Sequence, residues 1–395
     1  MKKGWQTKRL GDVSVVGAGN SAPQDEALFE DGTIPFFRTA DAGRVRFGDI
    51  AASTDYLNDN GAKGLRRFSP GTILFPKSGA STFLNHRVML GVEGCVSSHL
   101  ATIVADEKQA HPRFLLYFLS TVAAQDLVQD HAYPSLNLPT IAGIEIHFPP
   151  LAEQQRIVGL LDRAFEGLAT AKANAEKNLQ NARALFESHL QSVLLRSKKW
   201  KWKTLGDLCD DVEYGSSAKS KKEGKVPVLR MGNIQDGQLD WENLVYTDDK
   251  AEIKKYLLKH NDVLFNRTNS PELVGKTAIY KGEMPAIFAG YLIRIHRKEE
   301  LLDADYLTYF LNSQIAFDYG KTVVISSVNQ ANINGTKLKT YPIPAPSLSE
   351  QKAIVAKLNE LSEETQRLAR LYERKVAALE ALKKSLLHQA FAGEL

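Results

Sequence analysis

Hydrophobic residues recur every three or four positions along two long stretches of the chain, residues 151–196 and 349–391. Neither stretch contains proline, and both are rich in Ala, Leu, Glu, Gln, Lys and Arg, which favour helices. This spacing puts the apolar side chains on one helix face, as in a coiled-coil seam. Each stretch therefore predicts one long helix. The predicted seam comprises Val158, Leu161, Phe165, Leu168, Ala175, Leu179, Ala182, Phe186 and Val193 in the first stretch, and Leu358, Leu361, Leu368, Tyr372, Leu379, Leu382 and Leu386 in the second.

A different pattern precedes each helical stretch. Short apolar runs such as Gly-Thr-Ile-Leu-Phe at 71–75 alternate with turn residues, which predicts short strands and loops. Prolines close both regions, and Glu153 or Glu350 follows in the first turn of the predicted helix, a typical helix start. The chain therefore divides into a first head (residues 1–150), a central helix (151–199), a second head (200–348) and a C-terminal helix (349–395).

The two halves of the chain are related by an internal duplication. Short motifs return in the same order at offsets from 190 residues (Phe75 to Phe265) to 197 residues (Trp5 to Trp202). The paired segments are 10–12 and 205–207, 34–38 and 226–230, 71–75 and 261–265, 114–119 and 306–311, and 149–154 and 346–351. The period is too long for a solenoid, so a whole unit is repeated.

The duplication leads to a specific architecture. Two long helices from repeated units can bury their apolar faces against each other, and the first helix must lead the chain to a second head. We therefore expect an α+β protein with two similar α/β heads separated by two long antiparallel helices that act as a spacer. The alternative is that each long helix packs on its own head.

Composition restricts the function classes. With 395 residues, 43% hydrophobic and 24% charged, the chain is neither disordered nor a disulfide-rich scaffold. Its net charge of +4 permits nucleic-acid binding without requiring it, and the two heads are nearly neutral. Cys95 and Cys209 are too few for a four-ligand zinc site and are expected to be reduced, mostly buried thiols, with a single disulfide between them as the alternative. No apolar run is long enough for a membrane span or a signal peptide, which indicates a cytoplasmic protein.

Motifs for catalysis and cofactor binding are incomplete. The Gly-x-Gly-x-x-Ala run at 17–22 follows an apolar strand, but no helix can follow it before Pro35. Two Gly-Lys-Thr triplets, at 275–277 and 320–322, lack the upstream glycine of a phosphate-binding loop. Phe148 precedes Pro-Pro where an amino-methyltransferase needs Asn or Asp. We expect no catalytic residue, no bound cofactor and no metal in this chain.

This architecture resembles the specificity subunit of type I restriction-modification systems, over the whole chain. The motifs that carry the resemblance are Trp5 with Leu10-Gly11-Asp12, Trp202 with Leu205-Gly206-Asp207, the Pro…Leu-x-Glu-Gln helix starts at 149–158 and 346–355, and the tail 386–395. The resemblance implies a non-catalytic subunit whose heads, called target recognition domains, each read one half of a split double-stranded DNA sequence. It implies that the helices fix the gap between the halves and dock two methyltransferase subunits, which bring S-adenosylmethionine. Restriction and translocase subunits can join them.

DNA contacts are expected from loops on the heads, because arginine suits phosphate and guanine and asparagine suits adenine. The candidates in the first head are Arg38, Arg44, Arg46, Lys77, Ser78, Asn85, His86 and Arg87. Those in the second head are Lys219, Lys221, Arg230, Asn266, Arg267, Thr268, Asn269, Ser327, Asn329 and Gln330. Each could instead belong to an ordinary solvated loop. For the whole chain, the alternative function is a two-headed coiled-coil adaptor that binds proteins and has no DNA specificity.

Overall fold

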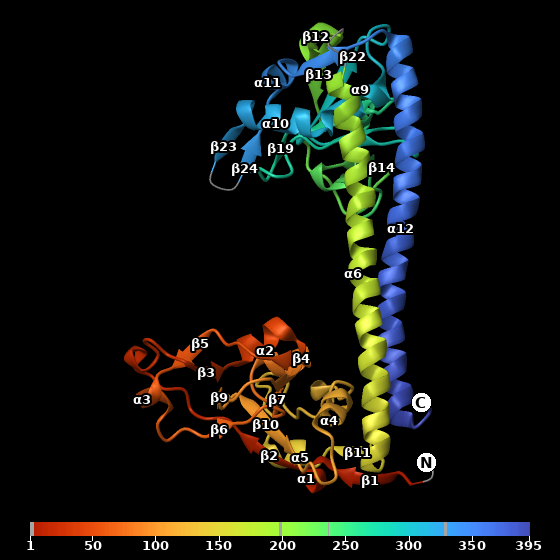
Figure 1. Ribbon diagram of the computed structural model, residues 1–395. Helices are drawn as coiled ribbons and strands as arrows, with labels where there is room; N and C mark the ends of the chain where they lie inside the picture. The colour runs from red at the N-terminus through yellow and green to blue at the C-terminus, as the bar shows by residue number, and fades with distance from the viewer. Residues whose placement is uncertain (1–3, 197–199, 236, 328–329) are drawn as a thin grey trace. The chain divides into compact units, whose positions relative to one another are not determined.

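The structure, a computed structural model, describes residues 4–196, 200–235, 237–327 and 330–395 (Figure 1). The chain divides into two compact units. Unit 1 comprises Met1–Asn174 and Lys375–Leu395, and unit 2 comprises Ala175–Arg374. Each unit therefore contains one head together with part of both long helices. No helix in the described ranges is long and apolar enough to cross a membrane.

Unit 1 is built on two sheets. The larger has the strand order β2 (Ser14–Ala18), β10 (Leu100–Ala105), β7 (Ile73–Pro76), β8 (Arg87–Leu90) and β4 (Phe47–Ile50). The smaller has the order β5 (Asp55–Leu57), β3 (Ile34–Phe37), β9 (Gly94–Val96) and β6 (Arg67–Phe68). A separate pair joins β1 (Gln6–Arg9) to β11 (Glu145–Phe148). The helices of this head are α1 (Leu10–Val13), α2 (Thr39–Val45), α3 (Asp59–Ala62), α4 (Pro112–Leu119) and α5 (Leu138–Ala142).

Unit 2 repeats this plan. Its larger sheet has the order β13 (Cys209–Tyr214), β22 (Leu292–Arg297), β18 (Val263–Asn266) and β20 (Thr277–Ile279). A three-stranded sheet has the order β17 (Val245–Thr247), β14 (Val226–Leu229) and β21 (Ile287–Phe288), and another has the order β19 (Thr268–Asn269), β24 (Gln330–Asn332) and β23 (Ile325–Ser327). Two further sheets are strand pairs: β12 (Lys201–Thr204) with β25 (Pro342–Ala345), and β15 (Ile234–Gln235) with β16 (Gln238–Leu239). Its head helices are α7 (Leu205–Leu208), α8 (Lys250–Tyr256), α9 (Ala304–Leu311), α10 (Gln314–Val323) and α11 (Gly335–Lys339).

The predicted duplication is confirmed by the strand order. The sequence β2-β10-β7-β8 in unit 1 corresponds to β13-β22-β18-β20 in unit 2, and the parallel pair β3–β9 corresponds to β14–β21. The Leu-Gly-Asp motifs open α1 and α7. Their leucines, Leu10 and Leu205, are fully buried, while Asp12 and Asp207 accept a hydrogen bond from the backbone N–H three residues earlier. The motif is thus a buried anchor followed by a helix cap.

Close backbone approach explains the glycine-rich run at 17–22. A Cβ on Gly19 would lie 2.3 Å from the carbonyl oxygens of Val96 and Ser97. Gly215, the corresponding residue of unit 2, would place a Cβ 2.4 Å from the carbonyl oxygen of Phe288. Both glycines therefore let the larger sheet approach the neighbouring sheet, which is a packing role rather than phosphate binding.

Both long helices are present as α6 (Leu151–Arg196) and α12 (Leu348–Ala392). Within unit 1 they run antiparallel, because Arg156 donates to the carbonyl oxygen of Leu395 at 2.7 Å and Lys172 pairs with Glu380 at 2.6 Å. Within unit 2, Arg183 pairs with Glu373 at 2.8 Å. The helices also pack on the heads. The cores of the two units include Val158 and Leu387, and Leu190 and Leu358, respectively.

The predicted seam is wrong at Leu382, and it leaves out buried residues of both helices, among them Leu190, Leu194 and Thr365. Leu382 is exposed, whereas Lys383 lies half-buried with its ammonium 4.7 Å from the ring centre of Phe47 and 5.0 Å from that of Phe165. A lysine can occupy a seam position because its long stem packs on apolar groups and its charge meets aromatic faces. Thr365, a polar residue between the predicted seam positions Leu361 and Leu368, is buried and donates its hydroxyl to the Leu361 carbonyl oxygen at 2.8 Å.

Each head is joined to its long helix by the same type of hydrogen bond. Tyr117 on α4 donates to Asp162 on α6, and Tyr309 on α9 donates to Asn359 on α12 at 2.6 Å. Burial, followed by the nearby carboxylates, raises the pKa of Tyr309 to about 12, so this phenol stays a donor at neutral pH. Both cysteines are buried free thiols, as the sequence predicts.

Candidate nucleic-acid interface

Polar loops gather at one edge of the larger sheet in unit 1. Strand β7 ends and β10 begins at this edge, since Pro76 pairs with Leu100. The Lys77 N–H donates to the His99 carbonyl oxygen at 3.0 Å, and the Leu136 N–H donates to the Lys77 carbonyl oxygen at 2.8 Å. The edge therefore brings together residues 77–79, 97–99 and 130–136, which we call loop edge 1.

Unit 2 forms the same edge with different side chains. The Arg267 N–H donates to the Tyr291 carbonyl oxygen at 3.0 Å, and the Ile333 N–H donates to the Arg267 carbonyl oxygen at 2.9 Å. These two bonds match those of Lys77, so Lys77 and Arg267 occupy corresponding positions. We call residues 267–270, 289–291, 325–327 and 330–332 loop edge 2.

At loop edge 1 the predicted candidates Lys77 and Ser78 lie together. Lys77 is partly exposed, and Ser78 Oγ lies 2.7 Å from Nδ1 of His99. Ser78 also forms an isolated bridge with Ser135. His99 and Ser135 were not among the predicted residues. The duplication could have indicated both residues, because His99 and Ser135 correspond to Tyr291 and Asn332, which contact Arg267 in unit 2.

At loop edge 2, Arg267 is held by its neighbours. Its guanidinium donates to the Gly290 carbonyl oxygen at 3.3 Å and to Asn332 Oδ1 at 3.4 Å, and it lies 4.9 Å from the ring centre of Tyr214. Asn269 and Gln330 belong to the neighbouring strands β19 and β24. Ser327 ends β23, and Asn329 lies outside the described residues.

Three predicted contacts are corrected by burial. Arg87, Asn266 and Thr268 have almost no exposed surface, so their side chains cannot meet DNA in this conformation. Arg87 lies with its guanidinium carbon 3.5 Å from the ring centre of Phe75 and donates to the His86 carbonyl oxygen at 2.8 Å. Burial lowers the pKa of Arg87 to about 9.

The remaining candidates of unit 1 are not among the residues that form loop edge 1. Arg38 pairs with Asp55 and Arg44 pairs with Asp41, so both guanidinium groups have partners within the head. Asn85 donates to Gln125 Oε1 at 2.8 Å and accepts from the Ala124 N–H, which makes it a loop-fixing residue. Arg46 is exposed beside His86, whose pKa is lowered by burial and then by Arg46 and Arg87.

In unit 2, two lysines and Arg230 also lie outside loop edge 2. Lys219 and Lys221 are exposed on the loop before β14, and Lys221 pairs with Asp248 at 3.2 Å. Arg230 donates to the Asn243 carbonyl oxygen at 2.8 Å and precedes a short 3-10 helix. The predicted candidates therefore form two loop edges and several separate surface groups, not one continuous patch in each head.

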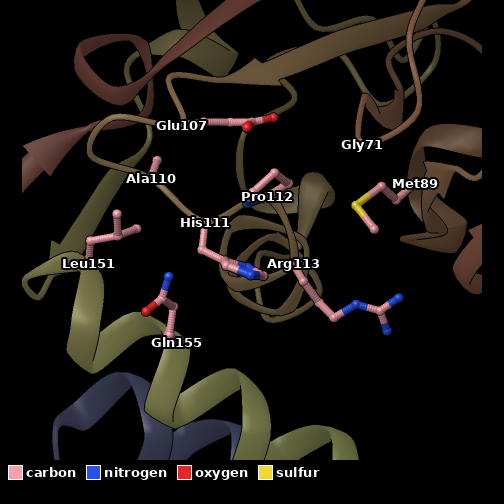
Figure 2. A pocket seen from close by; sticks show the side chains of 9 residues that line it. All are labelled: Gly71, Met89, Glu107, Ala110, His111, Pro112, Arg113, Leu151 and Gln155. Carbon is pink, nitrogen blue, oxygen red and sulfur yellow. The ribbon is translucent and has the colours of Figure 1, made fainter.

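A polar cleft in unit 1 lies between the starts of α4 and α6 (Figure 2). Leu151 and Gln155 line it from α6, and His111, Pro112 and Arg113 line it from the start of α4. Arg113 is ion-paired with Asp49 and lies 3.5 Å from Asp162, so its charge is already balanced. The cleft lies apart from the residues of loop edge 1. Across the described ranges, no group of three or more His, Cys, Asp or Glu side chains is arranged to hold a metal ion.

Comparison with known proteins identifies the family. A family profile described as the type I restriction modification DNA specificity domain matches residues 2–179 and again 197–373. The MjaX type I restriction enzyme specificity subunit of Methanocaldococcus jannaschii is 31% identical over 197 residues, which span 49% of this chain and 45% of that protein. The StySPI type I restriction enzyme specificity subunit of Salmonella potsdam is 24% identical over 428 residues, covering all of this chain and 90% of that protein.

A solved structure shows the same fold. It comes from work on complex assembly and conformational transition of a type I R-M system, and it covers 100% of this chain and 99% of its own with a TM-score of 0.80 and 19% identity. The profile matches the two halves separately, in agreement with the two loop edges and the repeated strand order. The chain belongs to the type I restriction-modification DNA specificity family, with one specificity domain matched in each half.

Proposed function

We propose that this chain is the sequence-determining, non-catalytic subunit of a type I restriction-modification complex, and that each unit contacts one half of a split DNA target through its loop edge. The observation that carries the proposal is the duplicated edge itself. Lys77 and Arg267 occupy the same backbone position in two units, yet their neighbouring side chains differ. A repeated frame with different side chains suits the reading of two different half-sites.

The chemistry of the edges supports contact with DNA rather than with protein. Lysine and arginine suit phosphate and guanine, while serine, asparagine and glutamine can bond to base edges in the major groove. The heads are nearly neutral, with 14 Lys+Arg against 15 Asp+Glu in residues 1–150 and 20 against 19 in residues 200–348. Affinity from charge alone is therefore low, and tight binding needs the assembled complex.

We further propose that α6 and α12 hold the two units at a set separation and dock two methyltransferase subunits. In this proposal those subunits carry S-adenosylmethionine and the adenine-methylating site, and restriction subunits join the same assembly. The family membership favours this function over a protein-binding adaptor. The helix pair supplies a continuous connection because α6 belongs to both units, as does α12.

The test is a map of methylated adenines in the genome of a host that expresses this chain together with the methyltransferase subunit of its own system. We expect a split motif with two defined halves and an undefined gap. The same host with the methyltransferase alone is the control and should lack the motif. Identical methylation in both hosts would contradict the proposal. Binding of the assembled complex to the mapped sequence should also weaken steeply as salt rises.

A further inference from the structure

The two loop edges share a frame but differ in one segment. In unit 1, residues 127–134 form turns, bends and irregular chain, whereas in unit 2 the corresponding segment contains β23 and β24, which pair with each other, and β24 also pairs with β19 (Figure 1). The segment ends in the same way in both units, because Leu136 and Ile333 make equivalent backbone bonds to Lys77 and Arg267. We therefore expect this segment to account for a difference between the DNA sequences that the two units recognise.

Tyr133 lies in this segment of unit 1 and is 83% exposed. Its loop is nevertheless well fixed. Asp130 Oδ1 accepts from the Ala132 N–H at 2.8 Å, and the His131 ring stacks on Phe83 at 5.6 Å between ring centres. The Gly79 N–H donates to the Pro134 carbonyl oxygen at 2.9 Å. The backbone thus holds the Tyr133 ring in solvent, one residue from the bond that joins the loop to residue 79.

A single exposed aromatic residue is common on protein surfaces and by itself indicates nothing. Three features set Tyr133 apart. Its loop is ordered by contacts on both sides, it belongs to loop edge 1, and Ser135 forms a bridge with Ser78, next to Lys77. Aromatic rings that stack on bases, together with positive charges that follow the backbone, bind single-stranded nucleic acids, and loop edge 1 carries both residue types in Tyr133 and Lys77.

The charges on the loop determine whether it can contact the phosphate backbone or the bases of DNA. Asp126 and Asp130 are exposed in or next to the loop, and they would repel phosphate. Asp130 also uses its carboxylate to hold the turn. The loop is therefore poorly suited to bind the backbone, while an uncharged ring can still contact a base. Lys77, on the neighbouring segment, supplies the positive charge that the loop lacks.

We propose that the Tyr133 ring contacts a base of the half-site that unit 1 reads, and that it helps to determine that half-site. This inference rests on the proposed function of the chain. The contact is apolar, either with the face of a base opened at a flexible step or with the methyl group of a thymine. Unit 2 has no equivalent ring on its segment within the described residues, since Gln330 occupies the corresponding position at an offset of 197. The contact therefore affects only one half-site.

The test uses the full chain assembled with its methyltransferase subunits and compares Tyr133→Ala, Tyr133→Phe and Val15→Ala. Val15 is also a largely exposed apolar residue of unit 1, but it pairs with Val104, away from loop edge 1, and so serves as a matched control. We expect Tyr133→Ala to weaken binding to the mapped site about tenfold and to relax the methylation motif in one half only. Tyr133→Phe, which keeps the ring, should stay within about twofold of the parent, as should Val15→Ala.

Two modified DNA series distinguish the kinds of base contact. Uracil in place of one thymine should weaken binding of the parent but not of Tyr133→Ala if the ring meets a methyl group. 2-Aminopurine in place of one adenine of the same half-site should change its fluorescence emission when the parent complex binds, but not when the Tyr133→Ala complex binds, if the ring meets a base face. An unchanged motif and affinity for Tyr133→Ala would overturn the inference alone. A parent complex without sequence-dependent binding would instead overturn the proposed function and this inference with it.

Discussion

Gln154 and Gln351 make the same three hydrogen bonds at the starts of the two long helices. Nε2 of Gln154 donates to the carbonyl oxygens of Gln109 and Pro149 at 2.9 Å, and its Oε1 accepts from the His111 N–H at 2.8 Å. Gln351 bonds in the same way to Leu301, Pro346 and Asp303. Both side chains are fully buried. The Leu-x-Glu-Gln motif is therefore a clamp that ties each long helix to the loop before α4 or α9.

Removal of either clamp should destabilise its unit. Gln154→Ala leaves two carbonyl oxygens and one N–H without their partner in a buried place, and we expect a loss of about 3 kcal/mol in the free energy of unfolding. Gln351→Ala should cost a similar amount. Gln155→Ala is the matched control, since Gln155 is exposed in the next position of the helix. Urea denaturation of the three variants checks this, and equal midpoints for Gln154→Ala and Gln155→Ala would contradict it.

A side chain at the paired glycines should disturb the contact between the two sheets of each head. Gly19→Ala and Gly215→Ala both place a methyl group within 2.4 Å of backbone oxygens, so the strands must separate, at a cost of about 2 kcal/mol or more. Gly167→Ala, at a position on α6 with open space around it, should instead stabilise by up to about 1 kcal/mol. Thermal unfolding measures all three. Loss of stability in Gly167→Ala but not in Gly19→Ala would rule out this explanation.

Acid should weaken unit 2 through Glu213. Burial alone would raise the pKa of this carboxyl, but hydrogen bonds from Arg294, at 2.6 and 3.0 Å, and from His296, at 3.0 Å, outweigh burial and lower it. Because the pKa is lower in the folded state, the stabilisation is present above the ordinary glutamate pKa. It is lost as pH falls through the lower folded-state value. Asp262, 2.9 Å from Arg294, faces the same group.

Glu213→Gln tests this pH dependence. At neutral pH the variant should be about 2 kcal/mol less stable than the parent, since a charged hydrogen-bond acceptor is lost. The difference should shrink as the pH falls below the ordinary glutamate pKa and through the lower value of the folded state, where the parent carboxyl also becomes neutral. Equilibrium unfolding at several pH values measures it. A difference that stayed constant from pH 7 to pH 3 would show that Glu213 contributes through packing alone.

Lys77 and Arg267 should affect separate halves of the recognised sequence, because they belong to different loop edges. Lys77→Ala should alter methylation in the half read by unit 1 and leave the other half unchanged, and Arg267→Ala should do the reverse. A lost base contact costs about 1–3 kcal/mol, or roughly 5- to 150-fold in preference for the correct base. Methylation maps of the two variants give the result directly. Lys259→Ala is the control and should alter neither half, because Lys259 is exposed and precedes the start of β18, whereas Arg267 follows the end of that strand.

The architecture was predictable because it depends on periodic and repeated patterns. Apolar spacing marks α6 and α12, and the recurring motifs mark two units, since both signals are summed over many residues. The seam error at Leu382 and Lys383 arises where a pattern based on polarity meets a lysine whose stem packs between two aromatic rings. One residue of shift is enough to exchange the buried and exposed positions.

The candidate interface was less predictable because residue type alone does not show which way a side chain points. Arg87 and Asn266 lie at the ends of β8 and β18, and their side chains turn into the core. Lys77, one residue beyond β7, remains partly exposed. Tyr133 gave no signal, since a lone aromatic residue in a polar loop has no pattern around it. The equivalence of Lys77 and Arg267 was available in the duplication and became clear through their matching backbone bonds.

Residues from the last part of the chain complete the core of the first unit. Phe391 lies 5.3 Å from Phe114 and 5.5 Å from Phe118 between ring centres, and Leu387 and Ala390 are buried in the same core. During synthesis, the ribosome makes the first head long before it makes these residues. Part of the apolar surface of the first head therefore stays uncovered until the second head has been made. A chain that ends before residue 375 lacks Leu387, Ala390 and Phe391, so the apolar core of its first unit stays incomplete.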